Sequence, residues 1–154
     1  MWPIVAFTLV LVAADQPCAP SSIMSEARNA EEVFLWGRGT VDGKNYDYIV
    51  TESVLAKTPE WLPEKQEPPL SIPAAMAIAK KVALADHPKF ETVVAAAIEI
   101  RPASSYRSKN RWFYSLDFAP VLEGQPYYGN EITVVLLLDG TVVKPRERQA
   151  GHPQ

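Results

Sequence analysis

The sequence is poor in the residues that build catalytic and metal centres. It contains one cysteine and two histidines in 154 residues, so no disulfide can form within the chain. Neither His87 nor His152 has a partner at the spacing of a metal site or a catalytic triad. No glycine-rich loop stands between a strand and a helix, which leaves phosphate binding unsupported. These absences favour a non-enzymatic protein and predict neither a metal nor a cofactor.

Strong charge of either sign is also missing. The net charge is −3 and the isoelectric point is about 5.4. Nucleic-acid binding needs a concentrated basic face, so no nucleic-acid partner is expected. The length is that of one domain, and a 47% hydrophobic composition is sufficient for a core.

The N-terminal segment is apolar but short. Residues 2–14 carry no charged side chain, and Asp15 ends the run. A bilayer-spanning helix needs about 20 residues, whereas this length is typical of the apolar core of a signal peptide. We therefore predict a signal peptide over residues 1–14, an exported (periplasmic or secreted) protein, and no membrane span in the mature chain. The alternative is a buried first strand of a cytoplasmic fold.

A polar, serine- and proline-rich segment follows, and we predict a flexible tether over residues 15–32. Cys18 lies in it, and we interpret this cysteine as a free thiol. The next part, residues 33–145, has the apolar content of a single α+β domain, and residues 146–154 form a polar tail. Within the domain, alternation of apolar and polar residues predicts the strands. These are expected at residues 46–56, 92–101, 111–119, 132–138 and 141–143, after a short apolar run at residues 33–36.

Two strand predictions carry further information. Residues 132–138 are apolar throughout except for Thr133, which is typical of a central strand covered on both faces. Asp42-Gly43 and Asp139-Gly140 are turn signals. Residues 92–101 are rich in alanine and could also form a helix, but the late Ile-Glu-Ile-Arg alternation favours a strand.

One helix is predicted over residues 74–86. Ser71 can cap it, Pro73 is compatible with its first turn, and His87-Pro88 ends it. A linker over residues 57–70 precedes this helix, with four prolines that exclude helix and central strand. Trp61, in the middle of the linker, is either an anchor to the core or an exposed binding residue.

The expected fold class is α+β, with one helix packed on a curved antiparallel sheet of about four strands. Three segments carry a family resemblance: Ser71-Ile72-Pro73-Ala74-Ala75-Met76, Trp112-Phe113-Tyr114-Ser115-Leu116-Asp117-Phe118, and the run from Val134 to Val142. Residues 70–145 thereby resemble the PepSY and cystatin-like class of small secreted bacterial domains, although Asp139-Gly140-Thr141 departs from the usual Asp-x-x-Thr-Gly ending. The resemblance implies a cystatin-like fold and binding or inhibition of other envelope proteins, and it brings no catalytic residues.

One loop, residues 120–130, has a local resemblance of its own. Gln125-Pro126-Tyr127-Tyr128-Gly129 resembles the Gln-x-Val-x-Gly loop of cystatin-type inhibitors, without the valine and without a later Pro-Trp loop. The alternative is an ordinary surface loop ending in glycine. We predict that this loop binds a protein partner, with Tyr127 and Tyr128 as aromatic anchors and Gln125 beside them.

A second hypothesis from a different class is a small-molecule pocket or an enzyme on the curved sheet, with Asp117, Glu99 or Tyr114 in the concave face. Charged residues could support it. Glu99, Arg101, Arg111 and Asp117 could share one face as a polar site, or they could form cross-strand charge pairs. A basic patch is also expected around the hairpin that follows residue 102, formed by Arg101, Arg107, Lys109 and Arg111, with a solvated turn as the alternative.

Overall fold

The structure is a computed structural model that describes residues 31–41, 44–103, 105 and 107–148. The predicted signal peptide, the tether as far as residue 30, Cys18, the Asp42-Gly43 turn, His152 and the end of the polar tail lie outside the described residues. In chain order the elements are β1 (Glu32–Val41), β2 (Lys44–Thr51), α1 (Glu52–Leu55), α2 (Ile72–Asp86), β3 (Thr92–Pro102), β4 (Trp112–Leu122), β5 (Gln125–Pro126), β6 (Ile132–Leu137), β7 (Val142–Val143) and β8 (Pro145–Glu147).

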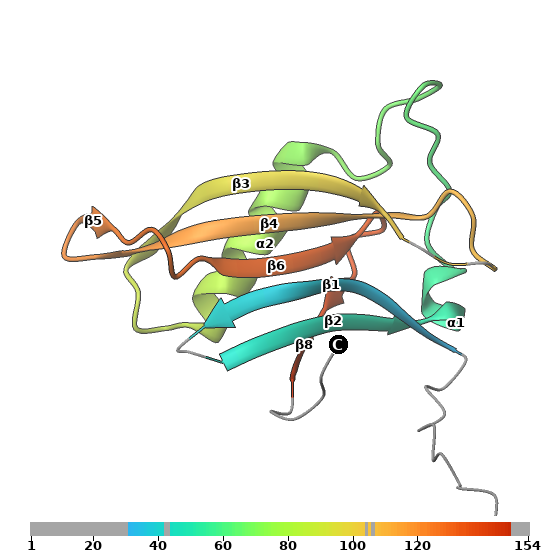
Figure 1. The fold of residues 1–154 in the computed structure, drawn as a ribbon. Coiled ribbons are helices and arrows are strands. Elements are labelled where there is room, and N and C mark those ends of the chain that lie inside the picture. Colours follow the sequence, from blue (N-terminus) through green and yellow to red (C-terminus); the bar gives the residue numbers. More distant parts are fainter. Residues whose placement is uncertain (1–30, 42–43, 104, 106, 149–154) are drawn as a thin grey trace, which may run out of the picture.

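The helix α2 packs on an antiparallel sheet, as expected for the fold class, and this sheet has five strands where about four were predicted (Figure 1). The strand order is β3-β4-β6-β7, and β5 pairs with β4. Ser71 caps the helix by accepting a hydrogen bond from the Ala74 backbone nitrogen at 3.4 Å. Ala75, Ala79 and Ala83 are buried at the contact, and such small side chains allow the helix to approach the sheet closely.

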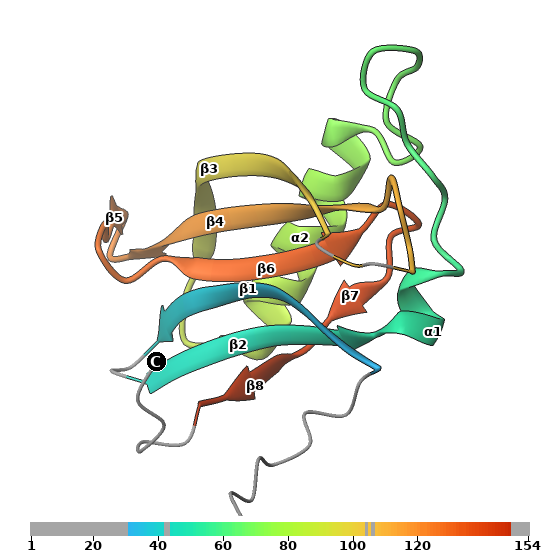
Figure 2. The same ribbon diagram turned by 45° about the vertical axis from the view of Figure 1, so that its right-hand side comes forward.

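A second sheet covers the other face, which the sequence analysis did not predict. It is three-stranded, in the order β1-β2-β8, and β1 is its strand next to β6 (Figure 2). Its core contains Val33, Leu35 and Tyr48, packed with Phe113 and Leu137 of the larger sheet. The helix and the second sheet thus bury opposite faces of β4 and β6.

The prediction of a central strand at residues 132–138 is confirmed. Ile132, Val134 and Leu136 belong to the core under the helix. Val135 and Leu137 belong to the core under the second sheet. A strand with both faces buried needs no polar alternation, which explains its composition.

The polar tail predicted over residues 146–154 is wrong at its start, because β8 runs over Pro145–Glu147 and pairs with β2. All three side chains are exposed, so no apolar alternation marks them as a strand. Backbone pairing and ion pairs hold this edge instead. Arg146 pairs with Glu32 at 3.0 Å, and Arg148 pairs with Asp47.

The strand predicted at residues 46–56 was too long and started too late. It runs over Lys44–Thr51, and Thr51 then caps α1 by accepting a hydrogen bond from the Val54 nitrogen at 3.3 Å. The apolar run at residues 33–36 is the first part of a longer strand, β1. The predicted strand ran past Thr51 because the apolar pattern continues, whereas the threonine cap ends β2 there. The apolar run stops at a glycine, whereas β1 continues through its glycines.

Trp61 anchors the linker, and the alternative of an exposed binding residue is wrong. Its side chain is buried, and its ring meets that of Trp112 edge-on with 5.2 Å between the centroids. The indole nitrogen donates to the Gln66 carbonyl at 2.9 Å. The Trp61 backbone nitrogen donates to the Asn110 carbonyl, also at 2.9 Å.

Candidate functional site

The predicted binding loop begins as an extension of the sheet. Leu122 and Gln125 are paired, and the two residues between them, Glu123 and Gly124, have positive φ angles of 52° and 74°. Two such residues form the tight turn that suits the twist of a hairpin. The loop predicted at residues 120–130 is therefore wrong at its start, because β4 continues through Leu122.

The two predicted tyrosines lie just beyond this hairpin and are exposed. Tyr127 is 50% and Tyr128 is 68% accessible. The Tyr127 nitrogen donates to the Pro120 carbonyl at 2.9 Å, which ties the start of the segment to β4. The Gly129 nitrogen donates to the Glu131 carboxylate at 2.7 Å, which braces its end. The two tyrosine rings are thus exposed to solvent, and hydrogen bonds fix the backbone before and after them.

An open hollow of about 550 Å³ lies beside the tyrosines. We call it the polar hollow. Asp117 of β4 and Thr133 of β6 stand directly opposite each other in it, and the Thr133 hydroxyl donates to the Asp117 carboxylate at 2.6 Å. Its lining residues are Ala96, Ala97, Asp117, Tyr128, Gly129, Glu131 and Thr133.

The β3 wall of the polar hollow is shaped by a bulge. Ala95 pairs with Phe118 and Ala97 pairs with Asp117, so Ala96 is an extra residue in the ladder. A bulge bends its strand and increases the local twist. Small side chains at Ala96 and Ala97 leave the space next to Asp117 open.

Thr133 also connects the two sheets. Its carbonyl accepts a hydrogen bond from the Tyr48 hydroxyl of β2 at 2.6 Å. Burial, and then the nearby carboxylates of Asp117 and Asp86, raise the pKa of Tyr48 well above its ordinary value of 10.0. Tyr48 therefore stays neutral and acts as a donor at ordinary pH.

The structure brings together only part of the predicted site. Tyr128 lines the polar hollow with Asp117, whereas Gln125 and Tyr127 are exposed outside its lining. The other pocket candidates are elsewhere. Tyr114 is buried under the helix and donates to the Leu70 carbonyl at 2.5 Å, and Glu99 forms an ion pair with Arg101 at 2.5 Å. Strand register places Glu99, Arg101 and Asp117 on one face of the larger sheet, but they do not form one polar site. Glu99 and Arg101 pair with each other along β3, so this is not the cross-strand pairing of the alternative.

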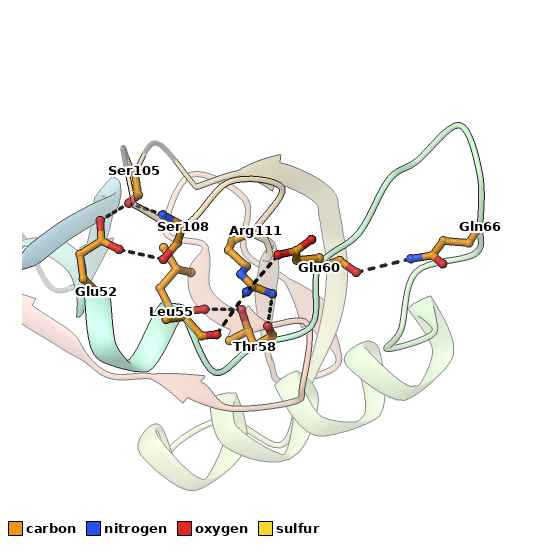
Figure 3. A network of polar contacts seen from close by, with 9 residues as sticks. Glu52, Leu55, Thr58, Glu60, Gln66, Ser105, Ser108 and Arg111 are labelled. Atoms are coloured by element: carbon orange, nitrogen blue, oxygen red, sulfur yellow. Dashed lines mark hydrogen bonds and ion pairs between the residues drawn. The ribbon is translucent and has the colours of Figure 1, made fainter.

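Arg111 clamps the linker to the β3–β4 connection (Figure 3). It donates to the Thr58 carbonyl and, at 3.2 Å, to the Ala56 carbonyl, and it lies 3.4 Å from the Glu60 carboxylate. Backbone carbonyls of a proline-rich segment have no regular ladder to join, so a guanidinium with several donors satisfies them. Arg111 therefore does not belong to an exposed basic patch.

A second clamp lies next to it. The Glu52 carboxylate of α1 accepts hydrogen bonds from the Ser105 hydroxyl and, at 2.8 Å, from the Ser108 hydroxyl (Figure 3). Both clamps lie at the end of the sheet away from β5, as Figure 1 shows. Arg111 and Glu52 therefore stabilise the fold. The carboxylates next to the two tyrosines are those of Asp117 and Glu131, which line the polar hollow.

Sequence reasoning missed Thr133 and Glu131. Thr133 did leave a signal, as the only polar residue in a long apolar strand, and a buried strand admits such a residue where it has partners. Glu131 left none, because a glutamate after a loop is ordinary. The Ala96 bulge is hidden as well, since an alanine run has the same pattern with or without an extra residue.

No group of three or more metal-binding side chains occurs in the described part of the chain. Among the same residues, no helix is both long and apolar enough to cross a bilayer. No family model, curated protein or solved structure matches this chain.

Proposed function

We propose that this chain is an exported, non-enzymatic protein-binding module that holds its partner with Tyr127, Tyr128 and the polar hollow. The observation that carries the proposal is the exposure of the two adjacent tyrosines at 50% and 68% on a braced segment. Aromatic residues on a fixed backbone bury much area at little cost in conformational entropy, and tyrosine is enriched among residues that dominate binding energy. The carboxylates of Asp117 and Glu131 supply acceptors beside them.

The same proposal includes the PepSY-like or cystatin-like relationship and the export signal. A helix packed on an antiparallel sheet is compatible with a cystatin-like domain. The apolar segment at residues 2–14 supports export. N-terminal sequencing of the protein from its source cells should show a mature chain that starts near Asp15, and an intact Met1 end in the cytoplasm would contradict export.

Site-specific photo-crosslinking tests the binding surface. With a photoreactive phenylalanine analogue in place of Tyr128, we expect one discrete crosslinked protein in the source cells. The matched control carries the analogue at Leu62, an exposed apolar residue of the linker. Figure 1 shows the linker at the end of the sheet away from β5. Equal crosslinking at both positions, or none at Tyr128, would contradict the proposal.

The purified partner then permits a quantitative test. Tyr127→Ala combined with Tyr128→Ala should weaken binding by at least about 30-fold, which corresponds to about 2 kcal/mol for lost aromatic anchors. Leu62→Ala combined with Ile72→Ala should leave binding unchanged, and both double variants should melt like the parent. Unchanged binding by the tyrosine variant would remove this surface from the proposal.

A small-molecule site or an enzyme at the polar hollow is the second candidate. It is favoured by the position of Asp117, half-buried and held by Thr133 in a hollow of about 550 Å³. Asp117→Asn separates the two candidates. If the hollow alone is the functional centre, this variant should lose function while the double tyrosine variant retains it. Loss of function in the double tyrosine variant supports the protein-binding surface, in which Asp117 is one of the acceptors.

A further inference from the structure

A second cavity of about 550 Å³ lies between the C-terminal half of α2 and the strands of both sheets. We call it the apolar cavity. Aliphatic side chains make most of its wall, among them Val82, Ile132, Val134, Val142 and Pro145. Tyr46 and Tyr48 of β2 complete it on the side of the second sheet.

This cavity exists because the last strand of the larger sheet is short. β7 has two residues, and Val143 and Val142 pair with Val135 and Leu136 of β6. The chain then passes through Lys144 into β8, which joins the other sheet. The earlier part of β6, at Ile132 and Thr133, has no β7 residue opposite it in the described chain, and the cavity occupies the space beside it.

The open edge of β6 does not call for an added peptide strand. Its outward carbonyl, that of Thr133, already accepts the Tyr48 hydroxyl at 2.6 Å. A peptide that paired there would have to displace this hydrogen bond, and the hydroxyl would then need another acceptor. The rest of the wall consists largely of aliphatic side chains, which make apolar contacts with a ligand and offer no hydrogen bonds to a peptide backbone.

The charges at the cavity do not select an ion. Asp86 and Lys144 are the two fully charged residues in the lining, both are exposed, and they carry opposite signs. A ligand with one charged group would therefore meet one attractive and one repulsive partner at the solvent side. His87 also lines the cavity, at the C-terminal end of α2, and its ring centroid lies 6.2 Å from that of Phe90.

We propose that the apolar cavity binds a neutral, largely apolar small molecule. Its volume lies within the range of about 300–1,000 Å³ that is usual for small-molecule sites. Binding replaces water at aliphatic walls, which is favourable without any ionic contact. Tyr127 and Tyr128 do not line this cavity, and it shares only Thr133 with the polar hollow. The proposal does not depend on the proposed protein-binding function.

The test uses the full chain and N-phenyl-1-naphthylamine, a neutral apolar dye whose fluorescence rises in apolar surroundings. We expect saturable binding of about one dye per chain. Ala85 lines the cavity and is exposed, so Ala85→Leu and Ala85→Trp place increasing volume at its mouth. Affinity should fall in that order, by at least tenfold for tryptophan. Ala77→Trp, at another exposed position of α2, is the matched control and should bind as the parent does.

Competition then identifies the chemical class. Dodecanol should displace the dye, while dodecanoate and dodecylamine should be weaker competitors, and neither Asp86→Asn nor Lys144→Gln should change the order. Dye affinity that is equal in the parent and both Ala85 variants would overturn the proposal, as would an equal loss in Ala77→Trp. Preference for dodecanoate or dodecylamine over dodecanol would overturn the neutral class. The double tyrosine variant should retain dye binding, which separates this test from that of the protein-binding surface.

Discussion

The polar hollow and the apolar cavity share one residue, Thr133, and are otherwise opposite in character. In the polar hollow, the Thr133 hydroxyl faces the Asp117 carboxylate in the company of Glu131. In the apolar cavity, the Thr133 carbonyl is closed off by Tyr48, and aliphatic walls surround it. Similar volumes therefore offer different chemistry on the two sides of the same strand position.

The difference follows from what covers the larger sheet. Around Phe113 and Leu137 the second sheet covers the larger sheet, and the buried residues there are apolar except for Ser115. At Asp117 the cover gives way to the open hollow, where a carboxylate keeps contact with water and one hydroxyl donor. Tyr48 marks the boundary, because its ring belongs to the second core and its hydroxyl reaches the strand edge.

The largest expected effect compares a buried with an exposed tyrosine. Tyr48→Ala should lower the free energy of unfolding by about 3–5 kcal/mol, because it leaves a cavity in the second core and an unpaired Thr133 carbonyl. Tyr128→Ala should change it by less than about 0.5 kcal/mol, since its side chain is exposed. Urea unfolding measures both. Equal losses in the two variants would contradict the assignment of Tyr48 to the core between the two sheets.

A smaller effect is expected from the hydroxyl of Thr133. Thr133→Val should destabilise the fold by about 1–2 kcal/mol, because Asp117 loses its protein donor and water only partly replaces it. Thr141→Val, an exposed threonine in the turn before β7, is the control and should lie within about 0.5 kcal/mol of the parent. Combining Thr133→Val with Asp117→Ala, which removes the acceptor, in a double-mutant cycle should reveal coupling between the two side chains. Strict additivity would contradict a stabilising hydrogen bond.

The hydroxyl of Tyr48 should contribute about 1 kcal/mol at pH 8, because Tyr48→Phe leaves the Thr133 carbonyl without its donor. This contribution should depend on pH in a defined direction. The pKa of Tyr48 is raised in the folded protein, so the unfolded chain releases this proton first as the pH rises. The contribution of Tyr48 to the free energy of unfolding is fully present below about pH 10. Above that pH it falls by up to about 1.4 kcal/mol per pH unit.

Chemical unfolding of the parent and of Tyr48→Phe between pH 8 and pH 11 measures this effect. The advantage of the parent should shrink above pH 10, because phenylalanine has no proton to release. Tyr114 also has a raised pKa through burial, and it is present in both proteins, so its contribution cancels in the difference. A constant difference up to pH 11 would contradict a buried, neutral Tyr48.

The smallest effect is expected at the rim of the polar hollow. Glu131→Gln should leave the free energy of unfolding within about 0.5 kcal/mol, since the amide oxygen can still accept from the Gly129 nitrogen. It removes one negative charge from the polar hollow and should not alter dye binding in the apolar cavity. A change in dye affinity measured by fluorescence would show that the two hollows are coupled.

Much of the fold was predictable from local patterns. Ser71 and the small apolar face identified α2, the alternation from Trp112 to Phe118 identified β4, and the apolar run identified β6. β8 was not predictable, because its three exposed residues gain their place from backbone pairing with β2. The second sheet was missed for that reason, and with it the cover over the far face.

The candidate site was predictable only in part. Tyr127 and Tyr128 stand next to a glycine in a polar loop, and the structure does leave both exposed. Asp117 and Arg111 looked alike as charged residues near one strand, yet one lines the polar hollow and the other clamps the linker. Their hydrogen-bond partners lie 16 and 53 residues away in the chain. The periodic patterns of helices and strands are local and do not predict contacts at such separations.

By itself, the sequence determined which segments bury apolar surface, since helix and strand periods are local consequences of backbone geometry. It also determined the shortage of histidine and cysteine chemistry. Only the tertiary structure decided that Thr133 lies between two hollows of opposite character. That outcome depends on strand register and on the second sheet, which place Asp117 on one side of Thr133 and Tyr48 on the other through contacts that are distant in the chain.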